Sequence, residues 1–327
     1  MYLRSLIIFS IYLFAKISFA GPLSEAEFNQ IIQEAEEYFA PIYLQNGKVF
    51  TIEPHFDYNE NNAKASAYSV DHYYIELYGG LVKHPRATKD SFRAAICHEV
   101  GHHFGGRPFV PKYYEDYFLF RGSSEGQADY WSAHTCLKKW FELEDHEKIL
   151  RQSSFSFEDL KFCRNYFSKE NESLLCTRII TAFKNMFSVE IETKPFLHFL
   201  SPNKEQKIPL AASVIHPKKA CRMETIYAGV ICNSDSDYGC LLSGKRPEAS
   251  RPLCWVGLEE ILEYEIPKLT NDKIRQLQEK LKKMNLKGFS YDFYEDDETK
   301  FLGGTLAKKH EAFINKISNE LIHPKIK

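Results

Sequence analysis

The sequence has no excess of basic residues, no CxxC pair and no internal repeat. Lysine and arginine total 42 against 44 acidic residues, so electrostatics give no support for a nucleic-acid partner. The missing CxxC pairs argue against a zinc site made of thiolates, although there are eight cysteines. Outside the N-terminus, no segment is apolar enough to span a bilayer. What remains is an ordinary globular composition, with 44% hydrophobic and 26% charged residues in a chain of 327.

The first twenty residues have the pattern of a secretory signal peptide. Arg4 gives a positive start, an apolar run follows over 6–14, and the small residues Ser18 and Ala20 mark a cleavage site. Lys16 is unusual in such a segment, so an uncleaved anchor is the alternative. We expect an exported protein, periplasmic or secreted, whose mature part has no stable membrane span.

All eight cysteines lie beyond this segment: Cys97, Cys136, Cys163, Cys176, Cys221, Cys232, Cys240 and Cys254. Export makes disulfides possible, and the even number suits complete pairing. Four of the cysteines fall between 221 and 254, so we expect that segment to be cross-linked. Eight cysteines allow about a hundred connectivities, and the sequence leaves the pairing open.

Apolar residues at helical spacing recur in several segments: 24–39, 90–104, 124–143 and, with many charges, 258–287. Two segments, 41–53 and 63–77, look like strands, with a turn at 59–62, and the aromatic stretch 107–123 between two helices is predicted as a loop. Weaker helical patterns continue to about 200, and 233–254 is predicted to be irregular. The composition and order of these elements indicate an α+β protein that is mostly helical, with a small sheet.

The stretch HEVGH contains the strongest chemical signal in the chain. His98 and His102 are four residues apart, so on a helix both imidazoles leave the same face, as two ligands of one tetrahedral zinc require. Glu99 projects beside them and can act on a metal-bound water without ligating the ion. The alternative is a helix whose histidines are incidental.

The next predicted helix supplies a candidate for the third ligand. Ser124 and Gln127 have the spacing of a capping box, and EGQAD places Glu125 and Asp129 on one helix face. Glu125 could ligate a metal while Asp129 accepts a hydrogen bond from a ligating imidazole. The alternative is a pair of solvated acids that the helix dipole favours at a helix start.

Five short segments in this order resemble a known family: NNAKASAY at 61–68, YIELYGGL at 74–81, HEVGH at 98–102, EGQAD at 125–129 and HPKKACR at 216–222. They are similar to motifs of the gluzincin metallopeptidase family of the CAAX prenyl protease and the heat-shock protease HtpX. The resemblance covers residues 61–222, about half the chain. It implies a zincin-like fold with a small sheet whose edge strand, at 63–70, borders the active site and binds a peptide substrate.

The resemblance also implies roles for individual residues. His98, His102 and Glu125 would bind Zn²⁺, Glu99 would be the general base, and Asp129 would support a ligand by hydrogen bonding. His216 and Arg222 would lie near the site and organise it or stabilise the oxyanion. The chain departs from the family in lacking internal membrane spans, in an imperfect N-A-x-A strand and in its aromatic stretch before Glu125. Cys97 directly precedes the matched HEVGH motif and Cys221 falls inside HPKKACR. Either cysteine could be in a disulfide or a free thiol.

We therefore expect an exported zinc metallopeptidase that hydrolyses peptide bonds by glutamate-assisted attack of a zinc-bound water. A non-catalytic zinc-binding envelope or secreted protein is the alternative, and a hydrolase of non-protein amides is a third. The expected organisation is a signal peptide over 1–20, a metallopeptidase domain over 21–255 and a helical extension over 256–327. The expected partner is a peptide or protein substrate. The sequence gives no oligomeric state.

Overall fold

The computed structural model describes residues 22–114, 118–187, 216–234, 239–240, 247–257 and 260. The predicted signal peptide lies outside these residues. So do most of the predicted C-terminal extension and, apart from Glu260, the helical pattern at 258–287. In the part of the chain that the structure describes, no helix combines the length and apolar character that a membrane crossing requires.

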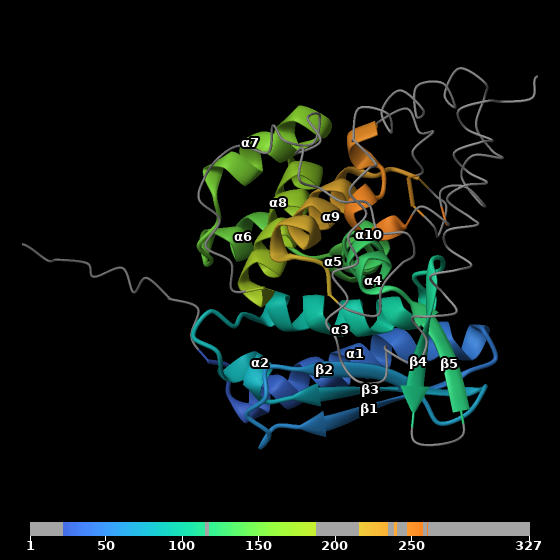
Figure 1. The fold of residues 1–327 in the computed structure, drawn as a ribbon. Helices are drawn as coiled ribbons and strands as arrows, with labels where there is room; N and C mark the ends of the chain where they lie inside the picture. Colours follow the sequence, from blue (N-terminus) through green and yellow to red (C-terminus); the bar gives the residue numbers. More distant parts are fainter. Residues whose placement is uncertain are drawn as a thin grey trace, which may run out of the picture.

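A small mixed sheet and one long helix form the lower layer of the molecule in Figure 1. Helix α1 (Glu25–Gln45) begins at Ser24, whose hydroxyl and backbone form a reciprocal capping box with Glu27. The sheet contains β1 (Val49–His55), β2 (Ala63–Ala67) and β3 (His72–Tyr78), in the order β1-β3-β2. Strand β3 is parallel to β1 and antiparallel to β2, which leaves β2 at one edge. The predicted class, mostly helical α+β with a small sheet, is confirmed.

Two details of the predicted sheet are wrong. Residues 41–45 belong to α1, because Tyr43 is fully buried and continues the apolar face of that helix. The predicted strand over 63–77 is two strands joined by a tight turn at 69–71. In this turn the amide of Tyr68 donates to the carbonyl of His72 at 2.8 Å. No glycine or proline marks the turn, so the alternating pattern continues through it.

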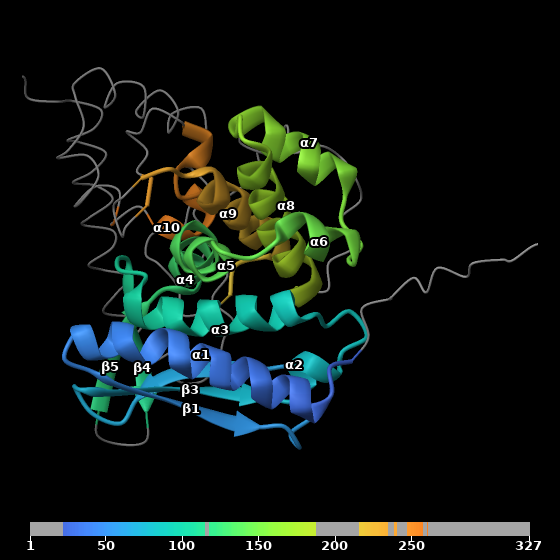
Figure 2. The ribbon, with the colours of Figure 1, turned by 180° about the vertical axis from the view of Figure 1, so that it is seen from behind.

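Helix α3 (Lys89–Phe104) lies between the lower layer and an upper group of helices, as both views show (Figures 1 and 2). Thr88 caps it, in a reciprocal pair of hydrogen bonds with Ser91. Its side chains are buried on every face along the middle of the helix because α1 and the sheet lie below it and α4 and α8 lie above. The predicted helix over 90–104 is confirmed.

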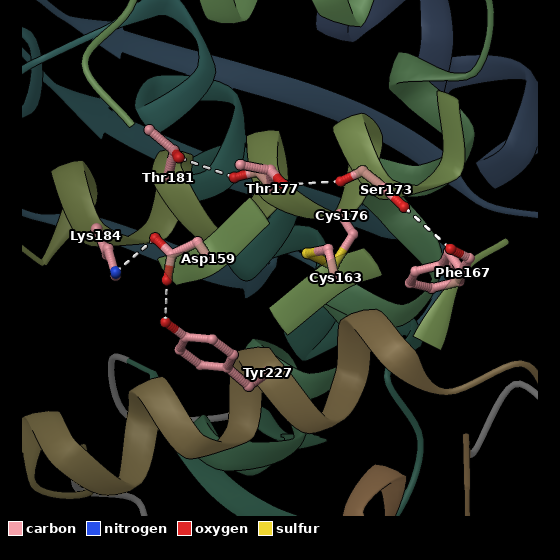
Figure 3. Close-up of a disulfide and its surroundings, with 9 residues drawn as sticks. All are labelled: Asp159, Cys163, Phe167, Ser173, Cys176, Thr177, Thr181, Lys184 and Tyr227. Carbon is pink, nitrogen blue, oxygen red and sulfur yellow. Dashed lines mark hydrogen bonds and ion pairs between the residues drawn. A yellow bond between two sulfur atoms is a disulfide. The ribbon is translucent and has the colours of Figure 1, made fainter. Parts of the chain in front are cut away.

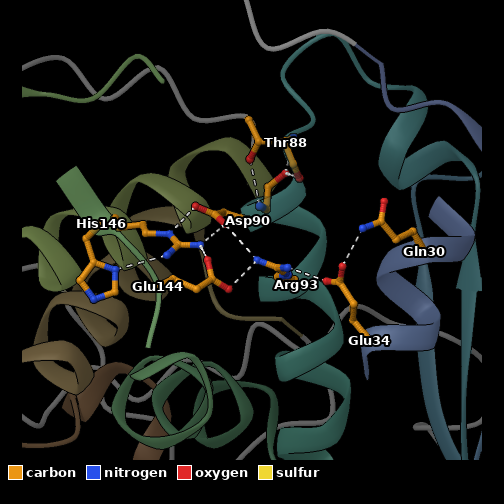
Figure 4. Close-up of polar contacts among 9 residues, drawn as sticks. Gln30, Glu34, Thr88, Asp90, Arg93, Glu144 and His146 are labelled. Atoms are coloured by element: carbon orange, nitrogen blue, oxygen red, sulfur yellow. Dashed lines mark hydrogen bonds and ion pairs between the residues drawn. The ribbon is translucent and has the colours of Figure 1, made fainter. Parts of the chain in front are cut away.

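Ion pairs fix the first half of α3 between the two layers (Figure 4). Arg178 is only 1% exposed and donates to both carboxylate oxygens of Asp90 at 2.7 Å and to Glu144 at 2.7 Å. On the next turn of α3, Arg93 contacts Glu144 at 3.1 Å and Glu34 of α1 at 2.5 Å. Because both arginines share Glu144, the position of α3 relative to α1 and α8 is strongly specified.

The remaining described helices follow in chain order: α2 (Gly80–Lys83), α4 (Glu125–Trp131), α5 (Leu137–Phe141), α6 (His146–Arg151), α7 (Phe157–Tyr166), α8 (Glu170–Met186), α9 (Lys219–Ile231) and α10 (Leu253–Val256). A π-helical turn, η1 (Ser132–Cys136), separates α4 from α5, so the single predicted helix over 124–143 has a break in its middle. A short 3-10 turn, η3 (Pro247–Ala249), precedes α10.

Glycine at position 101 allows α3 and α4 to approach closely. A Cβ added to Gly101 would lie 2.8 Å from the carbonyl oxygen of Ala128. Gly126 has a different neighbour, since its added Cβ would meet the indole of Trp255 at 2.1 Å. The segment around α10 therefore packs against α4 from the side away from α3.

The aromatic stretch predicted as a loop contains a β-hairpin, with β4 (Phe109–Tyr114) antiparallel to β5 (Phe118–Ser123). Aromatic residues favour strands, and the register of the two strands pairs Tyr114 with Phe118 and Phe109 with Ser123. Strand β5 leads directly to Ser124, the N-cap of α4. The hairpin therefore determines where α4 begins.

All eight cysteines form disulfides: Cys97–Cys136, Cys163–Cys176, Cys221–Cys254 and Cys232–Cys240. The predicted cross-linking between 221 and 254 is confirmed. Cys97 is not a free thiol, since its bond connects α3 to η1. Figure 3 shows the bond between α7 and α8 with its polar surroundings. Four disulfides are consistent with an extracytoplasmic protein.

Candidate metal centre

The second half of α3 presents two histidines to one buried site. His98 and His102 are each 2% exposed, and their ring centroids are 4.8 Å apart. His103 points elsewhere, and its Nδ1 lies 2.5 Å from the hydroxyl of Tyr43 in α1. On a helix, His103 points about 100° away from His102, and its contact with Tyr43 supports a structural role.

The start of α4 brings Glu125 to the same place. Ser124 accepts from the amide of Gln127, but the Gln127 side chain donates to the carbonyl of Gly105 at 2.6 Å instead of closing the capping box. That bond connects the first turn of α4 to the end of α3. Glu125, the first residue of α4, is held there at 6% exposure.

Imidazole nitrogens from three histidines converge on one oxygen of Glu125. The Nε2 atoms of His98, His102 and His216 lie 3.0, 3.4 and 3.0 Å from its Oε2. Two ligands bound to one zinc at about 2.0–2.1 Å with tetrahedral angles would lie about 3.3 Å apart. The observed separations are therefore those of atoms that can share one metal ion.

Hydrogen bonds at the opposite ring nitrogens strengthen this interpretation. The Nδ1 of His98 lies 2.7 Å from Oδ1 of Asp129, and the Nδ1 of His102 lies 2.7 Å from the carbonyl oxygen of Ser123. Both partners are acceptors, so both Nδ1 atoms carry the proton and the neutral rings have their lone pairs at Nε2. Two lone pairs facing a carboxylate oxygen repel unless a positive charge lies among them. A buried donor set of imidazoles and one carboxylate thus fits a divalent metal ion.

The pKa values of the site reflect the same need for positive charge. Burial lowers the pKa of His98, but the Asp129 carboxylate outweighs it and raises that pKa to about 9. Burial raises the pKa of Glu125, yet the His102 imidazole holds it well below its ordinary value. Without a metal, the site keeps a proton on an imidazole and a negative charge on Glu125.

Asp129 connects this site to α9. It is fully buried, and the guanidinium of Arg222 donates to its two oxygens at 2.7 and 2.8 Å. Against the effect of burial, the Arg222 charge lowers the pKa of Asp129 to about 2, so the carboxylate is ionised. The structure therefore brings Arg222 to the acid beside His98, and through Asp129 it fixes the orientation of that ring.

Glu99 lies beside the site with its carboxylate uncommitted. It is 7% exposed, and one of its oxygens lies within 4.8 Å of ring nitrogens of both His98 and His102. Among the described residues it makes no hydrogen bond or ion pair. Its negative charge contributes to the raised pKa of Arg222.

His216 differs from the other histidines because its side chain is 55% exposed. Its ring stacks on that of His98, with centroids 5.8 Å apart and an interplanar angle of 21°. It therefore stands between the buried ligand group and solvent. With His98 and Glu125 it forms a second combination of residues that could hold a metal.

Two contributors to the site were not predicted from the sequence. Ser123 acts through its backbone carbonyl, which no side-chain motif reveals. Arg251 donates to the carbonyl of Arg107 at 2.8 Å and to Gln127 at 3.3 Å, so it holds the base of the hairpin against α4. Cys254 lies three residues after Arg251 and forms a disulfide with Cys221. That cysteine was the only sequence signal that the segment around Arg251 lies near the motif at 216–222.

Comparisons with models of protein families, with curated proteins and with solved structures found no match. The interpretation of the site therefore rests on its own geometry and on the motifs in the sequence.

Proposed function

We propose that this protein is an exported zinc metallopeptidase, with His98, His102 and Glu125 as the metal ligands. The observation that carries the proposal is the convergence of the two α3 imidazoles on the Glu125 oxygen, with both Nδ1 atoms already bonded to acceptors. Two histidines and a glutamate form the ligand set of several zinc peptidases.

A bound zinc would supply a Lewis acid that polarises a carbonyl oxygen and lowers the pKa of a water molecule to about 7. The protein's own part is to hold the ligands and to move protons. Glu99 has the position and the free carboxylate that a general base needs, since it stands beside both imidazoles without a hydrogen-bond partner among the described residues. It would take a proton from the attacking water and deliver it to the leaving amine.

Asp129 and Arg222 act as positioning residues in this proposal. Among the described residues, both hydrogen bonds of the Arg222 guanidinium go to Asp129, which supports an organising role rather than direct oxyanion binding. His216 is the better candidate to contact substrate, because it is the exposed member of the group. As a donor toward the developing oxyanion it would stabilise the transition state.

The edge strand β2 offers a place for the substrate backbone. Residues 62 and 68 exchange hydrogen bonds with β3, so by alternation Ala63, Ala65 and Ala67 direct their amides and carbonyls to the opposite edge. No other described strand pairs with that edge, and β2 contacts α3. An extended peptide added to β2 would run alongside the helix that bears His98 and His102.

The replacement Glu99→Gln tests the proposal. The amide is almost the same size but cannot accept the proton, so zinc should remain at one ion per chain while hydrolysis of a casein-type substrate falls by at least a hundredfold. Glu142→Gln, an exposed neutralisation, serves as the matched control and should leave both values unchanged. Unchanged hydrolysis by the Glu99→Gln protein would show that Glu99 is not the base.

One observation favours a second candidate, a zinc-binding protein without catalytic activity. His216 Nε2 is as close to the Glu125 oxygen as His98 Nε2 is, at 3.0 Å. If His216 completes a tetrahedron of four protein ligands, no position remains for water and the site is structural. The uncommitted carboxylate of Glu99 is the reason to prefer the enzyme, because metal binding alone does not need it.

A further inference from the structure

A cavity of about 280 Å³ lies among α5, α8 and α9, and none of its lining residues belongs to the candidate metal centre. Phe167, Leu175 and Val230 supply apolar walls, and Asn233 and Glu172 supply polar groups. Two of the neighbouring residues, Phe167 and the disulfide-bonded Cys176, are labelled in Figure 3. The volume is close to the lower limit of ligand pockets, about 300 Å³, so the cavity suits a small molecule.

Lys138, in α5, is the only cation among the described residues that line this cavity. Its ammonium donates one hydrogen bond, to the carbonyl oxygen of Cys232 at 2.7 Å. An ammonium has three N–H donors, so this bond leaves two of them without a protein acceptor among the described residues. Cys232 is the C-cap of α9, where a positive charge is favoured, but capping accounts for one donor alone.

The acid that would balance Lys138 is missing from the described residues. Glu172 lines the same cavity, but its carboxylate is engaged by Lys169 at 3.0 Å. Burial lowers the pKa of Lys138 to about 7, and no carboxylate of the described residues opposes that effect. A buried cation without an acid is costly unless its counter-charge comes from elsewhere.

We propose that this cavity binds a small carboxylic acid with an apolar chain, whose carboxylate pairs with Lys138 while the chain contacts Phe167, Leu175 and Val230. The free N–H groups of Lys138 would supply charge-assisted hydrogen bonds to the ligand oxygens. The apolar walls would bury the chain and select against more polar anions. This site is independent of the proposed metal centre.

Calorimetric titration of the full, metal-loaded chain with octanoate tests the proposal. Octanoate should bind at a ratio of one per chain and at least tenfold more tightly than octanol or octylammonium, which have the same chain without the negative charge. Lys138→Met keeps the length of the side chain and should weaken octanoate binding at least tenfold. Lys139→Met, a change at the adjacent exposed lysine, should leave the affinity unchanged.

A second variant keeps the test valid if Lys138→Met fails to fold. Leu175→Trp fills the cavity and leaves Lys138 in place, so it should abolish octanoate binding. Equal affinities for octanoate and octanol, or octanoate binding that survives Leu175→Trp or a folded Lys138→Met protein, would overturn the proposal. Lys138 would then be a helix cap alone.

Discussion

Asp129 holds His98 by a hydrogen bond of 2.7 Å from the ring Nδ1, in a position with no exposed surface. The same carboxylate is held by Arg222, so a residue from α9 determines the orientation of a ring on α3. His98 therefore has its Nε2 directed at Glu125 before any metal arrives. Preorganisation of this kind is what raises the affinity of a metal site.

Replacing Asp129 with asparagine should weaken zinc binding by about 10- to 100-fold. The amide can still accept from His98, but it removes the charge that pairs with Arg222, so the guanidinium loses its ion-pair partner. A competition titration with a chromophoric chelator measures the change. Asp57→Asn, on the surface, is the control and should bind zinc as the unaltered protein does. Equal affinities in the two variants would remove Asp129 from the site.

The disulfide Cys97–Cys136 should contribute to both stability and metal binding. It closes 39 residues, against 13 for Cys163–Cys176, so chain entropy predicts losses of about 4 and about 3 kcal/mol in the free energy of unfolding when each is removed. Denaturant unfolding of the two double serine variants measures these losses.

Only the first of these bonds adjoins the site, because Cys97 precedes His98 and Cys136 follows the helix that bears Glu125. We therefore expect weaker zinc binding in the Cys97→Ser/Cys136→Ser protein and unchanged binding in the Cys163→Ser/Cys176→Ser protein. Loss of zinc binding in both would mean that the site depends on overall stability and not on this local link.

His134 should make stability depend on pH. Its Nε2 donates to the carbonyl of Ser234 at 3.0 Å, and its Nδ1 accepts from the hydroxyl of Thr135 at 2.7 Å. Burial, with the Lys138 charge, lowers its pKa to about 4, below the unfolded value of about 6.5. Between these values the unfolded chain binds more protons, so stability is complete above pH 6.5 and falls as pH decreases toward 4.

Linkage gives a loss of about 2 kcal/mol between pH 7 and pH 5 from this group. His134→Gln keeps a donor for Ser234 and cannot titrate, so urea unfolding at the two pH values should show a smaller difference in that variant. An identical pH dependence in both proteins would mean that His134 does not titrate in this range.

Local patterns predicted the parts of the site that are close in sequence. His98, Glu99 and His102 share one helix, and the spacing of apolar residues over 90–104 was enough to predict it. Ser123 could not be predicted, because every residue has a carbonyl and only the hairpin brings this one to His102. The pairing of Cys97 with Cys136 likewise depends on the packing of α3 against η1.

In the fold around the site, too, features with a local sequence signal were predicted and features without one were not. The strands at 109–114 and 118–123 were missed because the sequence between them has no glycine or proline. The two strands within 63–78 were merged for the same reason. The grouping of His216 and Arg222 with the α3 histidines came from the resemblance. Their separation of about ninety residues or more from Asp129 and Glu125 gives no periodic signal of its own.

His216 provides the decisive prediction, because the two candidate functions assign it different roles. In a peptidase it contacts the substrate, so His216→Ala should keep one zinc per chain and lower kcat about a hundredfold, the effect of losing one oxyanion donor. In a structural site it is a ligand, so the same change should release zinc. Lys218→Ala alters an exposed residue on the same segment and controls for disturbance of the backbone there.

X-ray absorption at the zinc edge separates the two outcomes independently of activity. Two imidazoles, one carboxylate and one water-derived oxygen are expected for the peptidase, and three imidazoles with one carboxylate for the structural site. The 55% exposure of the His216 side chain favours the first result, since ligands of closed sites are normally buried with their metal. Three imidazoles in the unaltered protein, with zinc lost from His216→Ala, would contradict the peptidase and leave Glu99 without a catalytic role.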